Sequence, residues 1–358
     1  MFGFGGNKIK DTDVINALKN VNDPDLNKDI VTLKMVKDVK IDGKKIFFTV
    51  ELTTPACPLK EKIKSDCEKA VKEAIPDAEE INVNMTATVT SFGIDNKLMS
   101  QVKNVIAIAS GKGGVGKSTV STNIALALAS TGAKVGLMDA DIYGPTIPAL
   151  LDVKEQPQVT DEKKMIPIEK YGLKLMSIGF LLKGNEPVIW RGPMVGGVIQ
   201  QFLRDVEWGE LDYLLVDLPP GTGDAQLTLS QVIPLSGVVI VSTPEDVALN
   251  IATKALSMFQ HLKVPILGIV ENMSYFIAPD TGNIYHIFGH GGAKQASEKL
   301  GIKFLGEIPL DISIRTGGDD GKPITLFDVE SDQAKRFQNV ASNMAASLSS
   351  EIFADSFV

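Results

Sequence analysis

The sequence predicts an α/β fold in which a mainly parallel sheet flanked by helices follows a small α+β domain. Short apolar runs of the buried-strand type alternate with helical stretches from Val105 onward, a pattern typical of parallel sheets covered by helices. The first hundred residues contain few glycines and no arginine, so they form a segment of different composition. With 358 residues, 44% hydrophobic and 22% charged, the chain has the length and composition of a folded protein of two or three domains.

The N-terminal domain is expected to span residues 1–95, followed by a linker at 96–103. The pair Asp42-Gly43 is a hairpin signal between two strands. After Pro58 the apolar residues have helical spacing, and the next segment alternates apolar and polar residues like a half-buried strand. In order, we expect a helix at 13–21, strands at 33–39 and 45–52, a helix at 58–74 and a strand at 81–89.

Residues 104–358 carry the alternating pattern of the larger domain. The last stretch has helical spacing from Ala334 to Leu348 and predicts a closing helix at 332–353. The pattern of residues 150–184 is less readable than that of the rest, and we assign no chemistry to them. The strands are expected at 105–109, 134–138, 213–216, 238–241, 266–270 and 304–306.

Charge and hydropathy exclude several classes of function. The chain has 36 basic and 44 acidic residues, and its net charge of -8 argues against a nucleic-acid partner. The apolar runs are far shorter than the roughly 18 residues that a membrane span needs, so we expect no membrane partner. Residues 1–13 lack the apolar core of a secretory signal and the arginines of a mitochondrial transit peptide, which makes the cytoplasm the expected location.

The strongest motif is GKGGVGKST at residues 111–119, directly after the strand expected at 105–109 and before a helical run. This is a P-loop in the context that it requires. The glycines permit a tight loop whose backbone N–H groups surround phosphate oxygens, and the dipole of the following helix points at the same anion. The sequence therefore predicts an ATP site formed by Gly111, Lys112, Gly113, Gly114, Val115, Gly116, Lys117, Ser118 and Thr119.

Charged residues around the loop indicate phosphoryl-transfer chemistry. We expect Lys117 to reach the β- and γ-phosphates, and Ser118 to ligate Mg²⁺ together with Asp217 at the end of the run YLLVD. Asp141, in the run DADIYGP, is the candidate for orienting the attacking water, because phosphoryl transfer depends mainly on positioning and charge stabilisation. Asp139 acts either structurally or on the metal. The expected activity is Mg²⁺-dependent hydrolysis of ATP to ADP and phosphate.

Two further features extend this prediction. Lys112 is a second lysine inside the loop, which resembles the deviant P-loop ATPases of the MinD/ParA-like class. Those enzymes hydrolyse nucleotide as face-to-face dimers in which this lysine crosses to the partner's phosphates; a solvated lysine is the alternative. The segment LPPGTGD at 218–224 is interpreted as a switch loop that responds to the γ-phosphate, with a rigid turn as the alternative.

The runs DADIYGPTIP, WRGPMVGGVIQQFLRD, DYLLVDLPPGTGDAQLTLSQ and ENMSYF resemble the Mrp (ApbC) family of iron–sulfur cluster carrier ATPases. The small domain with its LTTPACP motif is similar to a domain commonly fused ahead of that ATPase, so the resemblance covers nearly the whole chain. It implies that Asn272 contacts the adenine base and that the protein is a homodimer through its nucleotide face. It also implies that the protein binds iron–sulfur clusters and transfers them to apoprotein recipients.

The chain departs from this family at the cluster ligands. Many members follow the ENMSYF-like segment with a Cys-x-x-Cys pair, and two subunits then bridge one cluster; here residues 278–281 read APDT. A 4Fe–4S cluster normally takes four thiolates, and the sequence holds only Cys57 and Cys67. Cys57 is the candidate iron–sulfur ligand, because the expected helix start at Pro58 favours a thiolate, with a small buried turn residue as the alternative. Cys67 lies on the apolar helix face and is expected in the core.

His286 and His290 are four residues apart, a spacing that would suit a metal ion on a helix. The glycines around them argue against a helix. We therefore favour a structural or loop role over metal ligation.

Two functions stay open on the sequence alone. The first is an ATP-hydrolysing carrier of iron–sulfur clusters. The second is a nucleotide-gated adaptor that holds no cluster, because the usual Cys-x-x-Cys is absent. A reductase like the nitrogenase iron protein would need cysteines in the ATPase domain, and a membrane-positioning ATPase would typically end in a basic amphipathic helix, whereas residues 347–358 are acidic.

Overall fold

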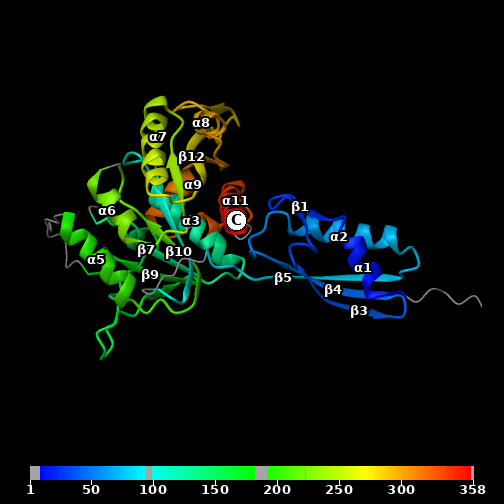
Figure 1. Ribbon diagram of the computed structural model, residues 1–358. Helices are drawn as coiled ribbons and strands as arrows, with labels where there is room; N and C mark the ends of the chain where they lie inside the picture. Colours follow the sequence, from blue (N-terminus) through cyan, green and yellow to red (C-terminus); the bar gives the residue numbers. More distant parts are fainter. Residues whose placement is uncertain (1–8, 93–98, 143, 182–191, 222, 356–358) are drawn as a thin grey trace, which may run out of the picture. The chain divides into compact units, whose positions relative to one another are not determined.

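The computed structural model describes residues 9–92, 99–142, 144–181, 192–221 and 223–355 (Figure 1). The chain divides into two compact units, one of residues 1–90 with 353–358 and the other of residues 91–352. The linker expected at 96–103 lies partly outside the described residues, and the first strand of the larger unit already begins at Val102. Each unit has its own sheet and is described by itself.

The smaller unit is an α+β fold around a three-stranded sheet. Its elements are α1 (Asp11–Leu18), β1 (Asn22–Asp23), β2 (Lys28–Asp29), β3 (Val36–Asp42), β4 (Lys45–Leu52), α2 (Lys60–Ala74) and β5 (Glu80–Ala87). β3 and β4 form an antiparallel hairpin, and β5 pairs parallel with β4 after α2 crosses over. The predicted hairpin is confirmed, and Gly43 in its turn has a φ of +63°, which favours glycine.

Periodicity explains how this unit packs. Ile63, Cys67 and Val71 recur at four-residue spacing on α2 and are buried, and alternate residues of β4 from Ile46 to Leu52 are buried with them. One stripe of the helix and one face of the sheet thus share a single apolar core. Cys67 has no exposed surface, as predicted for a core residue.

The larger unit is built on a mainly parallel sheet flanked by helices, as the alternating pattern predicts (Figure 1). Its described strands are β6 (Val102–Ala109), β7 (Val135–Asp139), β8 (Ile168–Lys170), β9 (Leu173–Ser177), β10 (Leu211–Asp217), β11 (Gly237–Ser242), β12 (Ile266–Ile277), β13 (Ile284–Tyr285) and β14 (Phe304–Leu310). Its described helices are α3 (Lys117–Ser130), α4 (Ile147–Leu150), the 3-10 helix η1 (Ile178–Phe180), α5 (Gly192–Asp205), α6 (Asp224–Val232), α7 (Asp246–His261), α8 (Gly292–Leu300), α9 (Ile312–Asp319), α10 (Ile324–Phe327) and α11 (Asp332–Asp355).

The strand order places β6, which leads into the P-loop, in the interior of the sheet. Hydrogen bonds connect the strands in the order β13-β12-β11-β6-β10-β7-β9-β8, and β14 pairs with β12. All pairings other than those of β8 and β13 are parallel. The carboxyl ends of the parallel strands therefore meet at one edge, where open α/β sheets bind their ligands.

Two parts of the sheet differ from the expectation. β8 and β9 lie in the 150–184 stretch, where Lys174 interrupts the apolar run of β9 and hides its periodicity. β12 ends at Ile277 rather than at 270, because Glu271, Asn272 and Ser274 are buried through hydrogen bonds. A hydropathy pattern does not reveal a strand that continues through buried polar residues.

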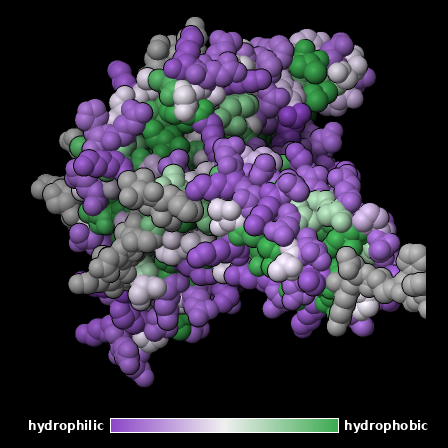
Figure 2. Space-filling view, turned by 45° about the vertical axis from the view of Figure 1, so that its right-hand side comes forward, coloured by the Kyte–Doolittle hydropathy of each residue, from purple (hydrophilic) through white to green (hydrophobic). Residues whose placement is uncertain are grey.

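The closing helix α11 confirms the predicted spacing, with buried side chains at Ala334, Phe337, Val340, Met344 and Leu348. Among the helices in the described ranges, none is both long enough and apolar enough to cross a membrane. The face drawn in Figure 2 is mostly hydrophilic, with separate hydrophobic areas. The cytoplasmic location and the expected lack of nucleic-acid and membrane partners stay predictions.

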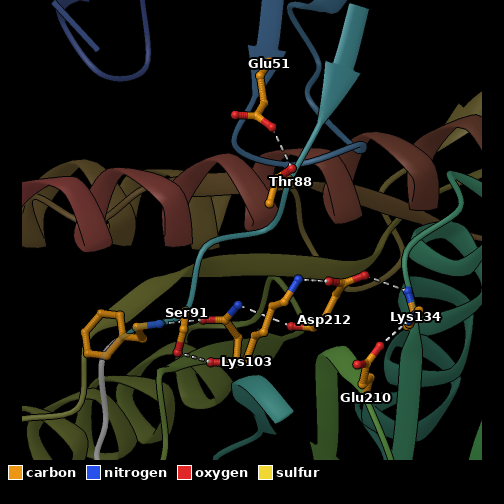
Figure 3. Close-up of polar contacts among 9 residues, drawn as sticks. Glu51, Thr88, Ser91, Lys103, Lys134, Glu210 and Asp212 are labelled. Atoms are coloured by element: carbon orange, nitrogen blue, oxygen red, sulfur yellow. Dashed lines mark hydrogen bonds and ion pairs between the residues drawn. The ribbon is translucent and has the colours of Figure 1, made fainter. Parts of the chain in front are cut away.

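Polar contacts fix the opposite edge of the sheet, where β6, β7 and β10 begin (Figure 3). Asp212 pairs with Lys103 Nζ at 2.8 Å and accepts the backbone N–H of Lys134 at 2.9 Å. Lys134 Nζ lies 2.6 Å from Glu210. Ser91 donates its hydroxyl to the carbonyl of Lys103 at 3.1 Å, so the chain that enters the larger unit runs beside the start of β6.

Candidate nucleotide-binding site

The P-loop joins the carboxyl end of β6 to the start of α3, which begins at Lys117. Gly114 and Gly116 have φ angles of +79° and +78°, in the left-handed region that favours glycine. A Cβ on Gly116 would also come within 2.3 Å of the amide nitrogen of Asn272. Both the backbone angle and this close approach therefore require glycine at position 116.

Two acidic residues reach the loop from neighbouring strand ends. Asp217 ends β10 and Asp141 follows β7, and these strands pair in parallel. Lys117 Nζ lies 2.7 Å from Asp217 Oδ2 and 4.0 Å from Asp141 Oδ2. Ser118 donates its hydroxyl to Asp217 Oδ2 at 2.5 Å. The structure thus brings together the four side chains that the sequence assigned to phosphate, metal and water.

The carboxylate of Asp217 shows that this group suits Mg²⁺. The side chain is fully buried, and its Oδ1 has no hydrogen-bond partner among the described residues. A buried carboxylate oxygen without a partner is unfavourable. A Mg²⁺ ion held by Ser118, or one of its waters, would supply that partner, and Mg²⁺ typically takes few carboxylate ligands and keeps several waters.

Asp139 lies beside this group and organises the following loop. Its Oδ1 accepts the N–H of Asp141 at 3.1 Å, and its Oδ2 accepts the Ser177 hydroxyl at 3.1 Å and the N–H of Ile147 at 3.3 Å. Burial, together with the nearby carboxylate of Asp217, raises the pKa of Asp139 well above its usual range. Of the two roles expected for Asp139, these contacts favour the structural one.

Lys112 is paired within its own chain. Its Nζ lies 3.5 Å from Glu245 Oε2, and the hydroxyl of Thr243 donates to the same oxygen. The side chains of Lys112 and Glu245 are 34% and 33% exposed. Glu245 was not predicted as a site residue, because a single glutamate between β11 and α7 matches no motif.

Asn272 connects β12 to the P-loop through a side-chain hydrogen bond. Its amide donates to the carbonyl of Val115 at 2.7 Å, and the residue is almost completely buried. The adenine contact implied by the family resemblance stays a prediction, because Asn272 is not among the residues that line the cavity beside the loop.

The cavity beside the P-loop has a volume of about 290 Å³ and is lined by most residues of that loop. The sequence did not predict Thr146 and Leu150 as lining residues. Pro220 also lines it and belongs to the expected switch loop at 218–224, in which Thr222 lies outside the described residues. Among the described residues, the lining consists of Ser110, residues 112–119, Asp141, Gly144, Thr146, Leu150 and Pro220.

Cys57 belongs to the smaller unit, where it is partly buried against the core. Burial raises the pKa of its thiol to about 11, and the carboxylates of Asp23 and Asp25 add to the shift. The expectation that the helix start favours a thiolate is therefore wrong. α2 begins only at Lys60, and burial outweighs the single backbone hydrogen bond from Leu59 that lowers the pKa.

A parallel sheet with a P-loop after an interior strand, together with a buried lysine and strand-end carboxylates, defines a P-loop NTPase. The family model described as NUBPL iron-transfer P-loop NTPase matches residues 101–345. A second model, described as iron-sulfur cluster assembly protein, matches residues 11–85. The chain belongs to the family of iron-transfer P-loop NTPases with this N-terminal domain.

Relatives extend over nearly the whole chain. The iron-sulfur cluster carrier protein of Synechocystis is 51% identical over 343 residues, which cover 94% of this chain and 97% of that protein. The chloroplastic Fe-S cluster assembly factor HCF101 of Arabidopsis thaliana is 43% identical over 340 residues, 93% of this chain and 63% of the plant protein.

Solved structures resemble the larger unit. The nucleotide-binding protein of Archaeoglobus fulgidus, solved in complex with ADP, has a TM-score of 0.59 at 42% identity and covers 67% of this chain and 94% of its own. The cell division ATPase MinD of Pyrococcus furiosus has a TM-score of 0.52 at 24% identity, covering 67% and 97% of the two chains. The MinD likeness shows the shared fold.

Proposed function

We propose that the protein is a Mg²⁺-dependent ATPase that carries iron–sulfur clusters to apoproteins. The observation that carries the ATPase assignment is the buried group of Lys117, Ser118 and Asp217, joined by contacts of 2.7 and 2.5 Å at the P-loop. Relatives that match over nearly their whole length and are named iron-sulfur cluster carrier protein support the cargo. The Archaeoglobus relative solved with ADP supports nucleotide as the ligand.

Each side chain of the site has a distinct role in this proposal. The backbone N–H groups of the P-loop and the ammonium of Lys117 neutralise the β- and γ-phosphates. Ser118 and Asp217 hold Mg²⁺, which neutralises charge that develops on the phosphate oxygens. Asp141, whose Oδ2 is 4.0 Å from Lys117 Nζ, orients the water that attacks the γ-phosphate.

Lys112 acts between two copies of the chain. In the proposed homodimer, which forms through the nucleotide face, its ammonium leaves Glu245 and reaches the phosphates of the second copy. The contact that it gives up is 3.5 Å long and partly exposed, so the cost of exchange is small.

The cargo needs more ligands than one chain supplies. Cys57 offers one thiolate per chain and two per homodimer, whereas a 4Fe–4S cluster normally takes four. Cys67 is fully buried in the core of its unit, where burial raises the pKa of its thiol to about 12. The remaining ligands therefore come from groups other than Cys67, such as cysteines of the recipient apoprotein. Although Cys57 also has a raised pKa, metal coordination itself deprotonates a thiol.

Iron and acid-labile sulfide per dimer, measured after anaerobic reconstitution in the presence of a small thiol that can supply the remaining ligands, test this cargo role. We expect the parent and a Cys67→Ala control to hold a cluster, and Cys57→Ala to lose it while hydrolysing ATP at the parent rate. Full retention of iron by Cys57→Ala would contradict the assigned ligand.

A second function is supported by one observation: Cys67 is buried and Cys57 is partly buried, so neither side chain is fully open to a cluster. On this proposal the protein is a nucleotide-gated adaptor whose N-terminal domain binds partners without holding a cluster. ATP turnover by a parent protein that binds no iron after reconstitution would favour the adaptor over the carrier.

A further inference from the structure

A group of metal-ligating side chains lies in the larger unit, apart from the residues assigned to Mg²⁺. Glu271 is on β12, His290 precedes α8, and Glu307 is on β14. One ligand atom of each residue lies within 4.8 Å of the ligand atoms of the other two. The three residues come from three different elements within residues 271–307, so the 286/290 spacing alone gives no hint of this group.

Hydrogen bonds hold the first carboxylate in place. Glu271 is fully buried, and its Oε1 accepts the N–H of Gly291 at 2.9 Å and the Ser274 hydroxyl at 2.5 Å. Its Oε2 accepts the N–H of Ala293 at 2.7 Å. Such bonds leave lone pairs on both oxygens and fix their direction, as outer-shell partners do for metal ligands.

The other two ligands contact each other directly, and one of them, Glu307, also lies near the Ser274 hydroxyl. His290 Nε2 lies 3.1 Å from Glu307 Oε2, and Ser274 is also 3.3 Å from that oxygen. Ser274 therefore lies between the two carboxylates, and its single proton is placed on the shorter bond, to Glu271. The imidazole of His286 lies against that of His290, with ring centroids 4.5 Å apart and an interplanar angle of 35°.

With His290 neutral, as a metal ligand must be, the described residues alone do not balance the charge of this group. Two carboxylates face one permanent cation, since Arg336 Nη1 lies 3.3 Å from Glu307 Oε1. Like charges that share one hydroxyl repel each other, and a divalent cation between them removes that repulsion. One imidazole nitrogen with carboxylate oxygens is a donor set for ions such as Zn²⁺, whereas Mg²⁺ prefers oxygen ligands alone.

We propose that Glu271, His290 and Glu307 bind one divalent transition-metal ion of the Zn²⁺ class, at a site separate from the nucleotide and from the cluster cargo. The ion would join β12, β14 and the start of α8. Because Glu271 directly precedes Asn272, which is bonded to the P-loop at Val115, the ion would also stiffen the connection between this group and the nucleotide site.

Zn²⁺ titration of the full chain tests the proposal. The titration uses a Cys57→Ser background, so that the partly buried thiol does not compete, and excess Mg²⁺, which occupies oxygen-only sites such as Asp217. We expect one tightly bound Zn²⁺ per chain in competition with a chromophoric chelator. X-ray absorption of the bound ion should show nitrogen and oxygen neighbours and no sulfur.

Matched substitutions identify the ligands. His290→Ala and Glu307→Gln should each weaken Zn²⁺ binding at least about tenfold. The controls are His261→Ala, an exposed histidine on α7, and Glu298→Gln, an exposed glutamate on α8, and both should bind Zn²⁺ like the background. Equal affinity in His290→Ala and His261→Ala, or no saturable Zn²⁺ binding in the background, would overturn the proposal. Neither result depends on cluster loading or ATP turnover.

Discussion

The nucleotide site and the turn at Cys57 differ in whether the surrounding residues already stabilise the charged side chains that each site needs. At the nucleotide site, Lys117 contacts Asp217 at 2.7 Å, and adjacent parallel strands deliver both carboxylates to the loop. Cys57 is one thiol in a partly buried turn, and its surroundings raise its pKa to about 11. At the nucleotide site, Lys117 and Asp217 stabilise each other's charge, whereas the environment of Cys57 favours the neutral thiol.

This difference separates the chemistry that the protein performs alone from the chemistry that needs a partner. A buried lysine and carboxylate that are already paired are held beside the loop without substrate, so both charges are in place before the phosphates and Mg²⁺ arrive. A thiol that must lose its proton binds metal only when the metal supplies the driving force. ATP turnover should therefore tolerate changes at Cys57, and cluster binding should depend on the ligands that a second molecule contributes.

Lys117→Ala should have the largest effect, because it removes the cation that neutralises the β- and γ-phosphates. Loss of one such group costs about 100- to 1,000-fold in turnover. It also leaves the buried carboxylate of Asp217 without its ion-pair partner, which destabilises the fold by about 3–5 kcal/mol. Steady-state ATP hydrolysis and thermal unfolding measure the two effects separately.

Lys134→Ala is the matched control for this loss. Lys134 pairs with Glu210 at the opposite edge of the sheet, and both side chains are largely exposed. Its removal should leave turnover unchanged. Turnover by Lys117→Ala within about twofold of the parent would show that Lys117 does not stabilise the transferred phosphate.

The next largest effect concerns the reactivity of Cys57. A pKa raised from 9.0 to about 11 lowers the thiolate fraction near neutral pH about 100-fold, and the thiolate is the reactive species. In a Cys67→Ala background, the maleimide reaction of the folded protein should be slow at pH 8 and should keep accelerating up to about pH 11. Unfolding in urea should restore the rate of an ordinary thiol. A rate that levels off near pH 9 in the folded protein would mean that the turn does not raise the pKa.

The sequence predicted the nucleotide site better than the thiol because the two depend on different information. GKGGVGKST specifies its own loop, and the strand run before Asp217 places that carboxylate at the edge where the loop lies. The state of Cys57 depends on burial and on Asp23 and Asp25, which a local motif does not reveal. The helix also begins two residues later than the sequence predicts, at Lys60 rather than Pro58, so the thiol lies farther from the helix start than expected.

The same reasoning explains what was missed elsewhere. All six strands expected in the larger unit form, because their apolar runs are uninterrupted. β9 was missed because Lys174 divides its short apolar run. Glu245, which pairs with Lys112, comes from a segment more than a hundred residues away, and only the folded sheet brings β6 and β11 side by side.

A comparison of Gly114 and Gly116 tests how much the contact between the P-loop and Asn272 contributes to stability. Gly114 and Gly116 share a left-handed backbone, so alanine at either position should cost about 1–2 kcal/mol in the free energy of unfolding. A Cβ at 114 meets nothing within 4 Å, whereas a Cβ at 116 meets the Asn272 amide. Gly116→Ala should therefore lose about 1–3 kcal/mol more than Gly114→Ala, because the buried amide is displaced from Val115. Equal losses in urea unfolding would show that the contact between Asn272 and the loop carries no stability.

The smallest predicted effect concerns the ion pair that Lys112 forms with Glu245 of the same chain. Glu245→Gln removes the charge that attracts Lys112 but keeps a group that the Thr243 hydroxyl can bond. A pair that is one-third exposed contributes at most about 1 kcal/mol, so releasing it should raise turnover no more than about fivefold. If Lys112 acts on a second copy, the increase should appear at low protein concentration, where dimer formation limits the rate, and vanish at saturation. A parent-like concentration dependence in Glu245→Gln, matching a Glu298→Gln control, would mean that Glu245 does not restrain Lys112.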